Sequence, residues 1–340
     1  MGTYLDWLRT DTPTRWWHDS ADPAELDLAL TRGASGVTTN PVLAAAAMRR
    51  APAAWLDART RVDERTLAPE ARAEALIEIA VANAAGRLRP HFERSGGRDG
   101  FVCAQVNPCR AGERAPMLAM ARRLHGWAPN IAVKLPATAA GLDVLERCVA
   151  DGITVTATVS FTVPQVVAIA ERHRCGSLRA RQNGVTPGRC FAVLMVGRLD
   201  DYLREVALDA KAPADEDDIR QAGIAVAKRA YALYVRRGYD ATLLVAALRG
   251  SYHLTELAGA DLVMSVHPTY QPPFASESLA REVRIDAPVP ESTLERLSTL
   301  PDFVRAYEPA GMTPDEFITF GATQRTLSQF TESWRALETL

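Results

Sequence analysis

The sequence predicts a (β/α)₈ barrel built as a single domain, residues 1–340. Eight short apolar runs are bounded by turn residues, and most of the segments between them have helical periodicity. Strands that alternate with helices are typical of βαβ units around a parallel sheet, and eight strands can close into a barrel. A length of 340 residues suits such a barrel with additions. A doubly wound open sheet is the competing fold.

The strands are expected in order along the chain, within a barrel core of residues 15–270. They occupy residues 15–20, 36–40, 101–106, 131–136, 154–161, 190–197, 242–248 and 262–268. The first helix should begin after Asp22, an N-cap residue followed by proline. Residues 69–88 carry an apolar helical stripe, which predicts a helical insertion after strand 2.

Further helices are expected at residues 139–150, 163–173 and 219–237. The arginine-rich segment 171–189 is interpreted as a solvated surface loop, with a cover over an anionic substrate as the alternative. Residues 275–340 follow the eighth strand and predict a C-terminal helical extension that caps the barrel.

Composition excludes several classes of function. A formal net charge of −2 offers no electrostatic attraction to nucleic acid or an anionic membrane. No apolar run approaches the roughly 18 residues of a membrane span, and residues 1–10 lack the apolar core of a secretory signal. Five scattered cysteines fit reduced thiols in a cytoplasm, three of them as core residues. Neither a metal-ligand spacing nor a nucleotide loop is present, so no metal and no cofactor are expected.

Polar residues gather at the ends of the expected strands. In a barrel, the carboxyl ends of the strands and the loops that follow them carry the active site. The residues there are Asp19, Thr38, Thr39, Asn40, Gln105, Asn107, Lys134, Thr154, Thr156, Thr158, Arg198, Arg249 and His267.

Lys134 is the most informative of these residues because its strand is otherwise apolar. Strand alternation places Ala132 and Lys134 on one face, and the outer face of a barrel packs against helices. Lys134 should therefore point into the barrel, where desolvation lowers a lysine pKa and leaves the neutral amine that attacks a ketone. The alternative is a lysine at a strand end that extends its amine into water.

Strand 5 and two arginines complete the picture. Polar and apolar residues alternate strictly through residues 154–161, so a barrel would place the threonines in its interior. Arg198 and Arg249 follow strands 6 and 7 and could hold a phosphate between them. Each arginine taken singly could equally be a surface ion-pair partner.

With these residues in place, the chain resembles the transaldolase family. The fairly specific matches are residues 36–41 (GVTTNP) and 130–138 (NIAVKLPAT); supporting matches are residues 152–158, 196–201 (VGRLDD), 243–249 and 257–261 (LAGAD). They run in order from about residue 15 to 270. Residues 275–340 match weakly.

The resemblance implies a role for each matched position. Lys134 would form an imine with a ketose phosphate, and Asp19 would move the proton of the C4 hydroxyl. Gln105 and Thr158 would serve the catalytic water. The implied substrate-binding residues are Thr38, Asn40, Asn107, Thr156, Arg198 and Arg249. Sugar phosphates in carbohydrate metabolism, such as the pentose phosphate pathway, would be the small-molecule partners, and a homodimer is one assembly that the resemblance allows.

Four positions depart from the family pattern. Gln105 stands where transaldolases carry glutamate, and it resembles the fructose-6-phosphate aldolase branch. Thr156 replaces an asparagine, Met195 an aromatic residue and Ala247 a serine. Three functions therefore remain open: a transaldolase-type transferase, an aldolase that releases dihydroxyacetone, and a non-catalytic barrel that binds sugar phosphates or a protein.

Overall fold

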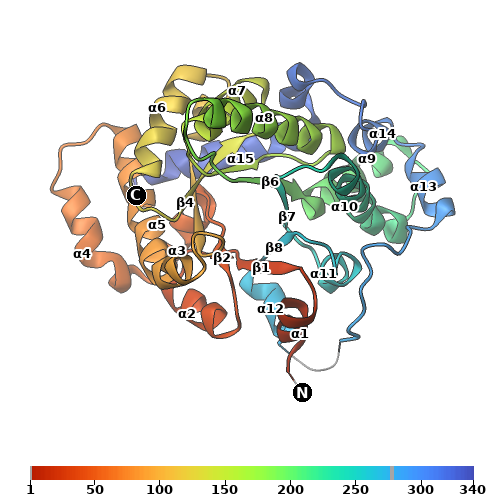
Figure 1. Ribbon diagram of the computed structural model, residues 1–340, viewed down its shortest axis with the longest axis horizontal. Helices are drawn as coiled ribbons and strands as arrows, with labels where there is room; N and C mark the ends of the chain where they lie inside the picture. The colour runs from red at the N-terminus through yellow and green to blue at the C-terminus, as the bar shows by residue number, and fades with distance from the viewer. Residues whose placement is uncertain (1, 276–278) are drawn as a thin grey trace.

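The computed structural model describes residues 2–275 and 279–340, and its centre is a closed barrel of eight parallel strands (Figure 1). The strands are β1 (Arg15–His18), β2 (Gly36–Val37), β3 (Phe101–Gln105), β4 (Ile131–Pro136), β5 (Val155–Thr158), β6 (Cys190–Met195), β7 (Thr242–Ala246) and β8 (Val263–Val266). Each strand pairs with its neighbour in sequence, and β1 pairs with β8 to close the ring. The (β/α)₈ barrel is thus confirmed, and the doubly wound open sheet is wrong.

Helices surround the barrel and extend it. They are α1 (Tyr4–Asp11), α2 (Pro23–Thr31), α3 (Pro41–Arg50), α4 (Pro52–Asp63), α5 (Pro69–Arg94), α6 (Arg114–His125), α7 (Ala139–Ala150), α8 (Val163–Gln182), α9 (Val196–Ala210), α10 (Glu216–Arg237), α11 (Ser251–Glu256), α12 (Gln271–Phe274), α13 (Glu291–Leu297), α14 (Pro301–Tyr307) and α15 (Gly321–Glu338), with 3₁₀ turns η1 (Pro108–Arg110), η2 (Pro268–Tyr270) and η3 (Pro314–Thr319). The expected N-cap is present, because Asp22 accepts the backbone N–H groups of Ala24 and Glu25. The insertion after strand 2 is confirmed as α3, α4 and α5.

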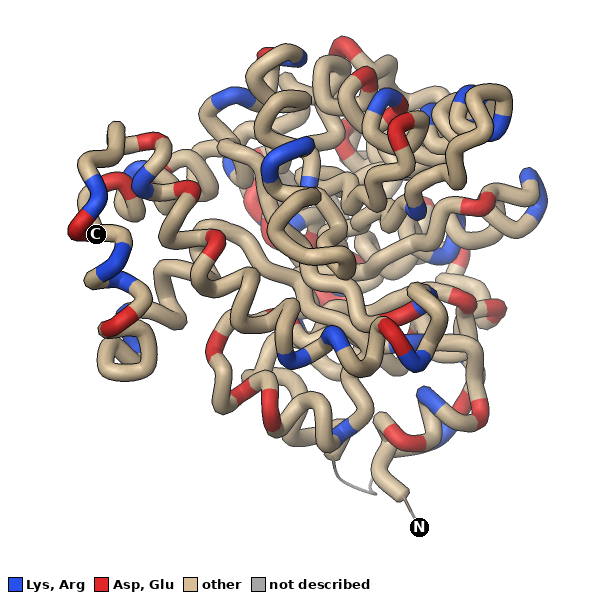
Figure 2. The backbone as a smooth tube through the Cα atoms, turned by 60° about the vertical axis from the view of Figure 1, so that its left-hand side comes forward, with Lys and Arg blue, Asp and Glu red and all other residues tan. Residues whose placement is uncertain are grey.

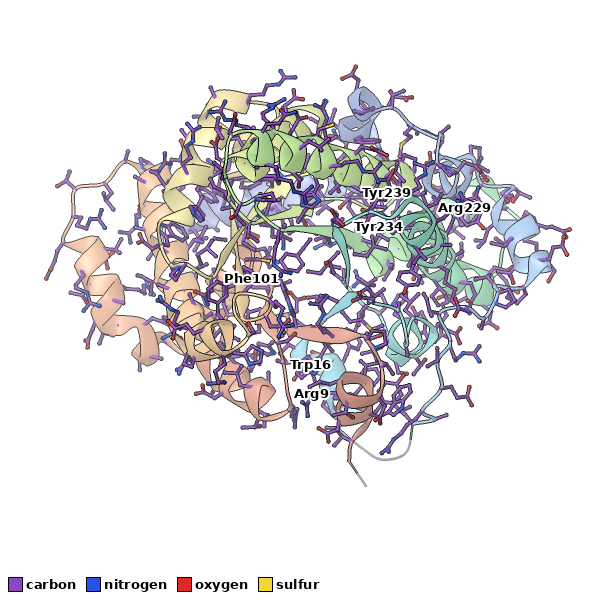
Figure 3. All side chains as sticks on the ribbon, viewed as in Figure 1. Arg9, Trp16, Phe101, Arg229, Tyr234 and Tyr239 are labelled. Carbon is purple, nitrogen blue, oxygen red and sulfur yellow. The ribbon has the colours of Figure 1, made fainter. Side chains whose placement is uncertain are left out.

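Aromatic side chains fill the amino-terminal half of the barrel interior. The ring of Phe191 packs edge-on against Trp17 and Phe101, with centroids 4.6 and 5.5 Å away. Of these three residues, Phe101 is labelled in Figure 3. Gly36 gives this cluster room, since a Cβ there would lie 2.5 Å from the Trp17 ring. The interior is therefore closed at this end, and only the carboxyl end of the strands can admit a ligand.

Strand β4 ends at Pro136 as the sequence predicts, and the other strands end one to three residues earlier than expected. Asp19, Thr38 and Thr158 lie at or just beyond the last paired residues, where the chain turns away from the sheet. Two of these turns bring non-glycine residues into the left-handed region, at Val159 (φ 56°) and Ala247 (φ 58°). A left-handed backbone conformation at a non-glycine residue costs energy and persists only when the surrounding structure stabilises it. The conformation of these two rim residues is therefore fixed by their contacts.

The arginine-rich segment 171–189 is helical over most of its length, so the expected surface loop is wrong there. Helix α8 continues to Gln182 and packs closely against α7. Gly176 allows this contact, because a Cβ there would lie 2.6 Å from the Glu146 carbonyl oxygen. Arg172 and Arg179 both pair with the Glu146 carboxylate.

The C-terminal extension is confirmed as helical from Glu291 onward, whereas residues 279–290 are irregular. Residues 276–278 of the expected range lie outside the described residues. Helix α15 packs against α3, α5, η1 and α9, elements that follow β2, β3 and β6. It therefore lies beside the rim that carries the polar residues (Figure 1).

Charges of both signs are interspersed over the chain in Figure 2, in line with the small net charge of −2. None of the helices in residues 2–275 and 279–340 is both long and apolar enough to cross a membrane.

Candidate active site

Lys134 lies inside the barrel, as strand alternation predicts. Its side chain is buried, and Nζ donates a hydrogen bond to the Thr39 carbonyl oxygen at 3.0 Å, in the segment that follows β2. In the sheet it sits between Gln105 of β3 and Thr156 of β5. Across the described ranges, no carboxylate forms an ion pair with this amine. The amine is thus held by a neutral oxygen.

Burial lowers the pKa of Lys134 from its ordinary value of 10.5. Cys103 and Asp19 act in the opposite direction, and Arg198 lowers the pKa further. Because desolvation is the largest of these effects, a larger fraction of the amine is neutral near neutral pH than for a lysine in water. A neutral amine is the form that can attack a carbonyl carbon.

These charges predict the pH dependence of imine formation. The rate should rise with pH as the amine loses its proton and level off above the folded-state pKa, below the pH expected of an ordinary lysine. Asp19→Asn removes a charge that raises the Lys134 pKa, so the profile should move to lower pH. Arg198→Gln should move it to higher pH. Reductive trapping rates measured from pH 5 to 10, about five pH units, would test both directions. If both substitutions moved the pH profile in the same direction, the opposite effects of these two charges on the Lys134 pKa would be refuted.

Asp19 is oriented by a chain of hydroxyl groups. The Thr38 hydroxyl donates to Asp19 Oδ1 at 2.5 Å and lies 2.6 Å from the Ser265 hydroxyl. Since Thr38 has one hydroxyl proton and gives it to Asp19, Ser265 must donate to Thr38. Ser265 was not among the site residues expected from the sequence, although it is the one polar residue in the apolar strand β8. In the sheet it pairs with the inward-facing Trp17.

Two buried polar atoms near the lysine lack a protein partner within the described residues. They are Oε1 of Gln105 and Oγ1 of Thr158. The Thr156 hydroxyl, by contrast, lies 3.4 Å from the Cys103 thiol. Leaving such atoms without a hydrogen bond is costly, so both are suited to hold water or a substrate hydroxyl. Cys103, expected only as a core residue, therefore also contacts a polar side chain inside the barrel.

Two asparagines follow β2 and β3, and the side chain of each bonds to a neighbouring helix. Asn40 caps α3, because its Oδ1 accepts the Leu43 N–H. Asn107 donates to Glu70 of α5 at 2.7 Å and accepts from the Cys109 N–H. Its side chain therefore ties η1 to α5, and the structure does not join it to the group around Lys134.

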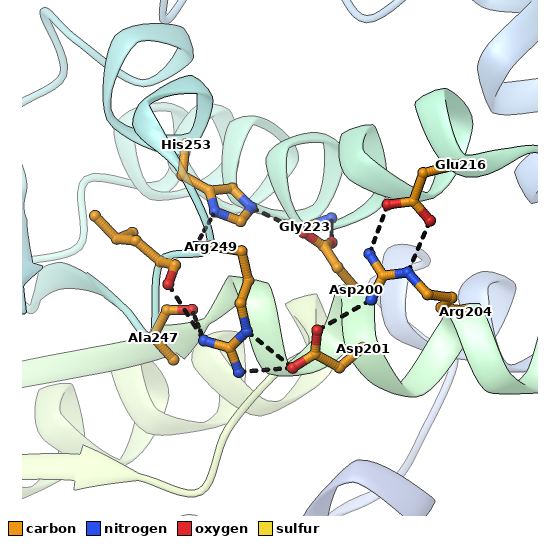
Figure 4. Close-up of polar contacts among 9 residues, drawn as sticks. Asp200, Asp201, Arg204, Glu216, Gly223, Ala247, Arg249 and His253 are labelled. Atoms are coloured by element: carbon orange, nitrogen blue, oxygen red, sulfur yellow. Dashed lines mark hydrogen bonds and ion pairs between the residues drawn. The ribbon is translucent and has the colours of Figure 1, made fainter. Parts of the chain in front are cut away.

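Arg198 and Arg249 come together as the sequence predicts, although each has protein partners. Arg198 lies in the first turn of α9 and donates to Gln329 of α15. Arg249 donates to Asp201 through Nε and Nη2, at 2.9 and 2.6 Å, and to the Ala247 carbonyl (Figure 4). Burial lowers the Arg198 pKa, and the charge of Arg249 lowers it further. Two neighbouring cations at a helix N-terminus favour an anion.

Lysine is rare in this chain, so few amines could act as the nucleophile at the carboxyl end of the barrel. Among 39 basic residues, only Lys134, Lys211 and Lys228 are lysines. Lys211 is exposed at the end of α9, and Lys228 is bonded to Glu256 and two carbonyl oxygens. Lys134 alone of the three projects among the polar residues at the carboxyl end of the barrel.

Comparison with known proteins agrees with this geometry. The sequence profile of the transaldolase/fructose-6-phosphate aldolase family matches residues 16–340. A transaldolase of Thiobacillus denitrificans is 29% identical over 298 residues, 85% of this chain and 82% of that protein. Transaldolases of Neisseria gonorrhoeae and Mycobacterium marinum are each 32% identical, over 61% of this chain and only 58% and 57% of their own lengths. With the profile match covering nearly its whole length, the chain belongs to the transaldolase/fructose-6-phosphate aldolase family.

Proposed function

We propose that the protein transfers a dihydroxyacetone unit from a ketose phosphate to an aldose, or aldose phosphate, through an imine at Lys134. The observation that carries this proposal is a desolvated amine inside the barrel, bonded to a neutral carbonyl oxygen and surrounded by polar groups at the open end. Relatives named transaldolase support the same reaction class. The five free cysteines fit a cytoplasmic enzyme.

In the first half-reaction, the neutral Nζ of Lys134 attacks C2 of the ketose to give a carbinolamine. The carbinolamine takes up a proton from the solvent and loses its hydroxyl as water, which leaves a protonated imine. The Asp19 carboxylate then accepts the proton of the C4 hydroxyl. The C3–C4 bond breaks, its electron pair moves into the imine, and an aldose phosphate leaves. The dihydroxyacetone unit stays on Lys134 as an enamine.

In the second half-reaction, C3 of the enamine attacks the aldehyde carbon of an acceptor. The new alkoxide takes the proton back from Asp19, and water hydrolyses the imine to free the product and the amine. Thr158 and Gln105 offer unpartnered oxygens to that water, while Thr38 and Asn40 border the dihydroxyacetone unit. Arg198 and Arg249 would bind the terminal phosphate.

An aldolase that releases dihydroxyacetone is the second candidate, and Gln105 favours it. An amide can orient water but cannot accept its proton, so the water step differs from that of an enzyme with glutamate there. A coupled assay with fructose 6-phosphate distinguishes the two reactions. A transferase forms glyceraldehyde 3-phosphate at an appreciable rate only when erythrose 4-phosphate is present; an aldolase forms it without an acceptor.

Gln105→Glu is expected to raise transferase activity several-fold, which is less than the roughly 10²- to 10⁴-fold effect of a fully placed general acid or base. A carboxylate at this buried position could accept the proton of the water, which glutamine cannot. The rate of transfer from fructose 6-phosphate to erythrose 4-phosphate checks this, with Gln105→Met as the control that removes the polar group. Equal or lower transfer by the glutamate variant would show that its surroundings are built for an amide.

A further inference from the structure

A buried acid–histidine pair lies behind the arginine site and is not part of the proposed chemistry. Asp200 and His253 are both fully buried, and His253 Nε2 lies 2.9 Å from Asp200 Oδ2. The other carboxylate oxygen of Asp200 accepts the Gly223 N–H at 2.8 Å. The pair therefore joins α9, α10 and α11 (Figure 4).

The hydrogen bonds of this pair determine which nitrogen of His253 carries the proton. Nδ1 lies 3.1 Å from the backbone nitrogen of Arg249, which donates to it, so Nδ1 must present a lone pair. The proton on Nε2 then points at Asp200. Because Gly223 already donates to the other oxygen, Asp200 serves as an acceptor on both sides. The carboxylate thus selects the histidine tautomer that can hold the Arg249 backbone.

Residues 247–249 are also held in two other ways, by the side chain of Arg249 and by close packing against α9. Asp201, the neighbour of Asp200, binds the Arg249 guanidinium. Gly197 lets the segment approach α9, because a Cβ there would lie 2.2 Å from the Ala247 carbonyl oxygen. Ala247 itself has a φ of 58°, a conformation that needs such support.

We propose that Asp200 and His253 are positioning residues that set Arg249 against Arg198 for the phosphate end of the substrate. Asp200 lies two residues after Arg198 on α9, and it reaches the backbone of Arg249 through a single imidazole ring. One short stretch of α9 therefore places both arginines. The proposal rests on the proposed function, because it takes the phosphate as the group that these arginines bind.

Asp200→Asn tests the proposal with almost no change in shape. The amide can accept from only one of its two donors and must turn an N–H toward the other, so the His253 tautomer and the Arg249 backbone lose their support. The concentration of fructose 6-phosphate that gives half-maximal borohydride trapping should rise about 10- to 100-fold, the scale of a displaced positioning group. Half-saturation by dihydroxyacetone, which has no phosphate, should stay unchanged.

Two further variants keep the test decisive if Asp200→Asn folds poorly. His253→Asn places an oxygen near the position of Nδ1 and should retain much of the fructose 6-phosphate affinity that His253→Leu loses. Glu93→Gln is the matched control, since it makes the same carboxylate-to-amide change in an exposed pair with Arg89 on α5 and should alter neither value.

The outcomes separate this proposal from the proposed function. If Asp200→Asn and His253→Leu weaken trapping by both ketoses equally, or by neither, the positioning role is refuted. A fall in thermal stability with an unchanged ratio of the two half-saturation values also refutes it. Failure of the unmodified protein to form any adduct would instead refute the imine mechanism.

Discussion

Replacing Lys134 with methionine is expected to abolish imine trapping and to lower turnover by about 10⁶-fold, the order found when a covalent nucleophile is removed. Methionine has a similar length but no amine, so C2 of the ketose has nothing to attack. The loss should appear in single-turnover kinetics with fructose 6-phosphate and in mass spectra of the borohydride-treated protein. Lys211→Met is the control, because Lys211 is exposed at the end of α9.

The same variant should keep or raise the stability of the fold. Burial lowers the Lys134 pKa below its unfolded value of 10.5, so between the two values the unfolded chain binds more protons than the folded one. Stability of the unmodified protein should therefore rise with pH through that window, and the part due to Lys134 should vanish in Lys134→Met. Denaturant unfolding of both proteins at pH 7 and 9, about two pH units apart, measures this difference in the free energy of unfolding. If Lys134→Met kept its turnover, the mechanism would be contradicted.

Asp19→Ala is expected to slow C3–C4 cleavage by about 10²- to 10⁴-fold while imine formation continues. The carboxylate is held at 2.5 Å by the Thr38 hydroxyl, in electrostatic reach of Lys134. Its removal takes away the base for the C4 hydroxyl but leaves the amine in place. Trapping should therefore yield an adduct with the whole ketose, where the unmodified protein yields the three-carbon adduct.

Thr38→Val provides the control for Asp19. It keeps the shape of the side chain and removes the hydroxyl that orients the carboxylate, so cleavage should slow by less than in Asp19→Ala. If Asp19→Ala instead accumulates the three-carbon adduct at an unchanged rate, another group takes the C4 proton.

Much of the fold was predictable because barrel strands are short, apolar and separated by amphipathic helices. Boundaries were less predictable where tertiary contacts override local signals. The expected helix 163–173 was too short: α8 continues to Gln182 and passes through Gly176, where α7 approaches too closely for a side chain. Except in β4, the carboxyl ends of the strands were placed too late because polar loop residues such as Thr38 and Asp19 follow the strands without a turn signal.

The candidate site could be predicted only as far as strand position determines direction. Lys134 follows from alternation within β4, and its burial from the helices outside the barrel. Hydrogen-bond partners depend on side chains from distant segments, which no local pattern specifies. For that reason the hydrogen-bond chain from Ser265 through Thr38 to Asp19 was missed, and so was the hydrogen bond from Asn107 to Glu70.

Reductive trapping with a ketose phosphate tests the central claim most directly. The protein is incubated with fructose 6-phosphate and borohydride, digested, and its peptides are weighed by mass spectrometry. With only three lysines in the chain, the modified position is assigned without ambiguity. The mechanism predicts a reduced adduct confined to the peptide that contains Lys134. Adduct on Lys211 or Lys228 alone, or no adduct with any ketose phosphate tested, would contradict it and favour a barrel that binds sugar phosphates without catalysis.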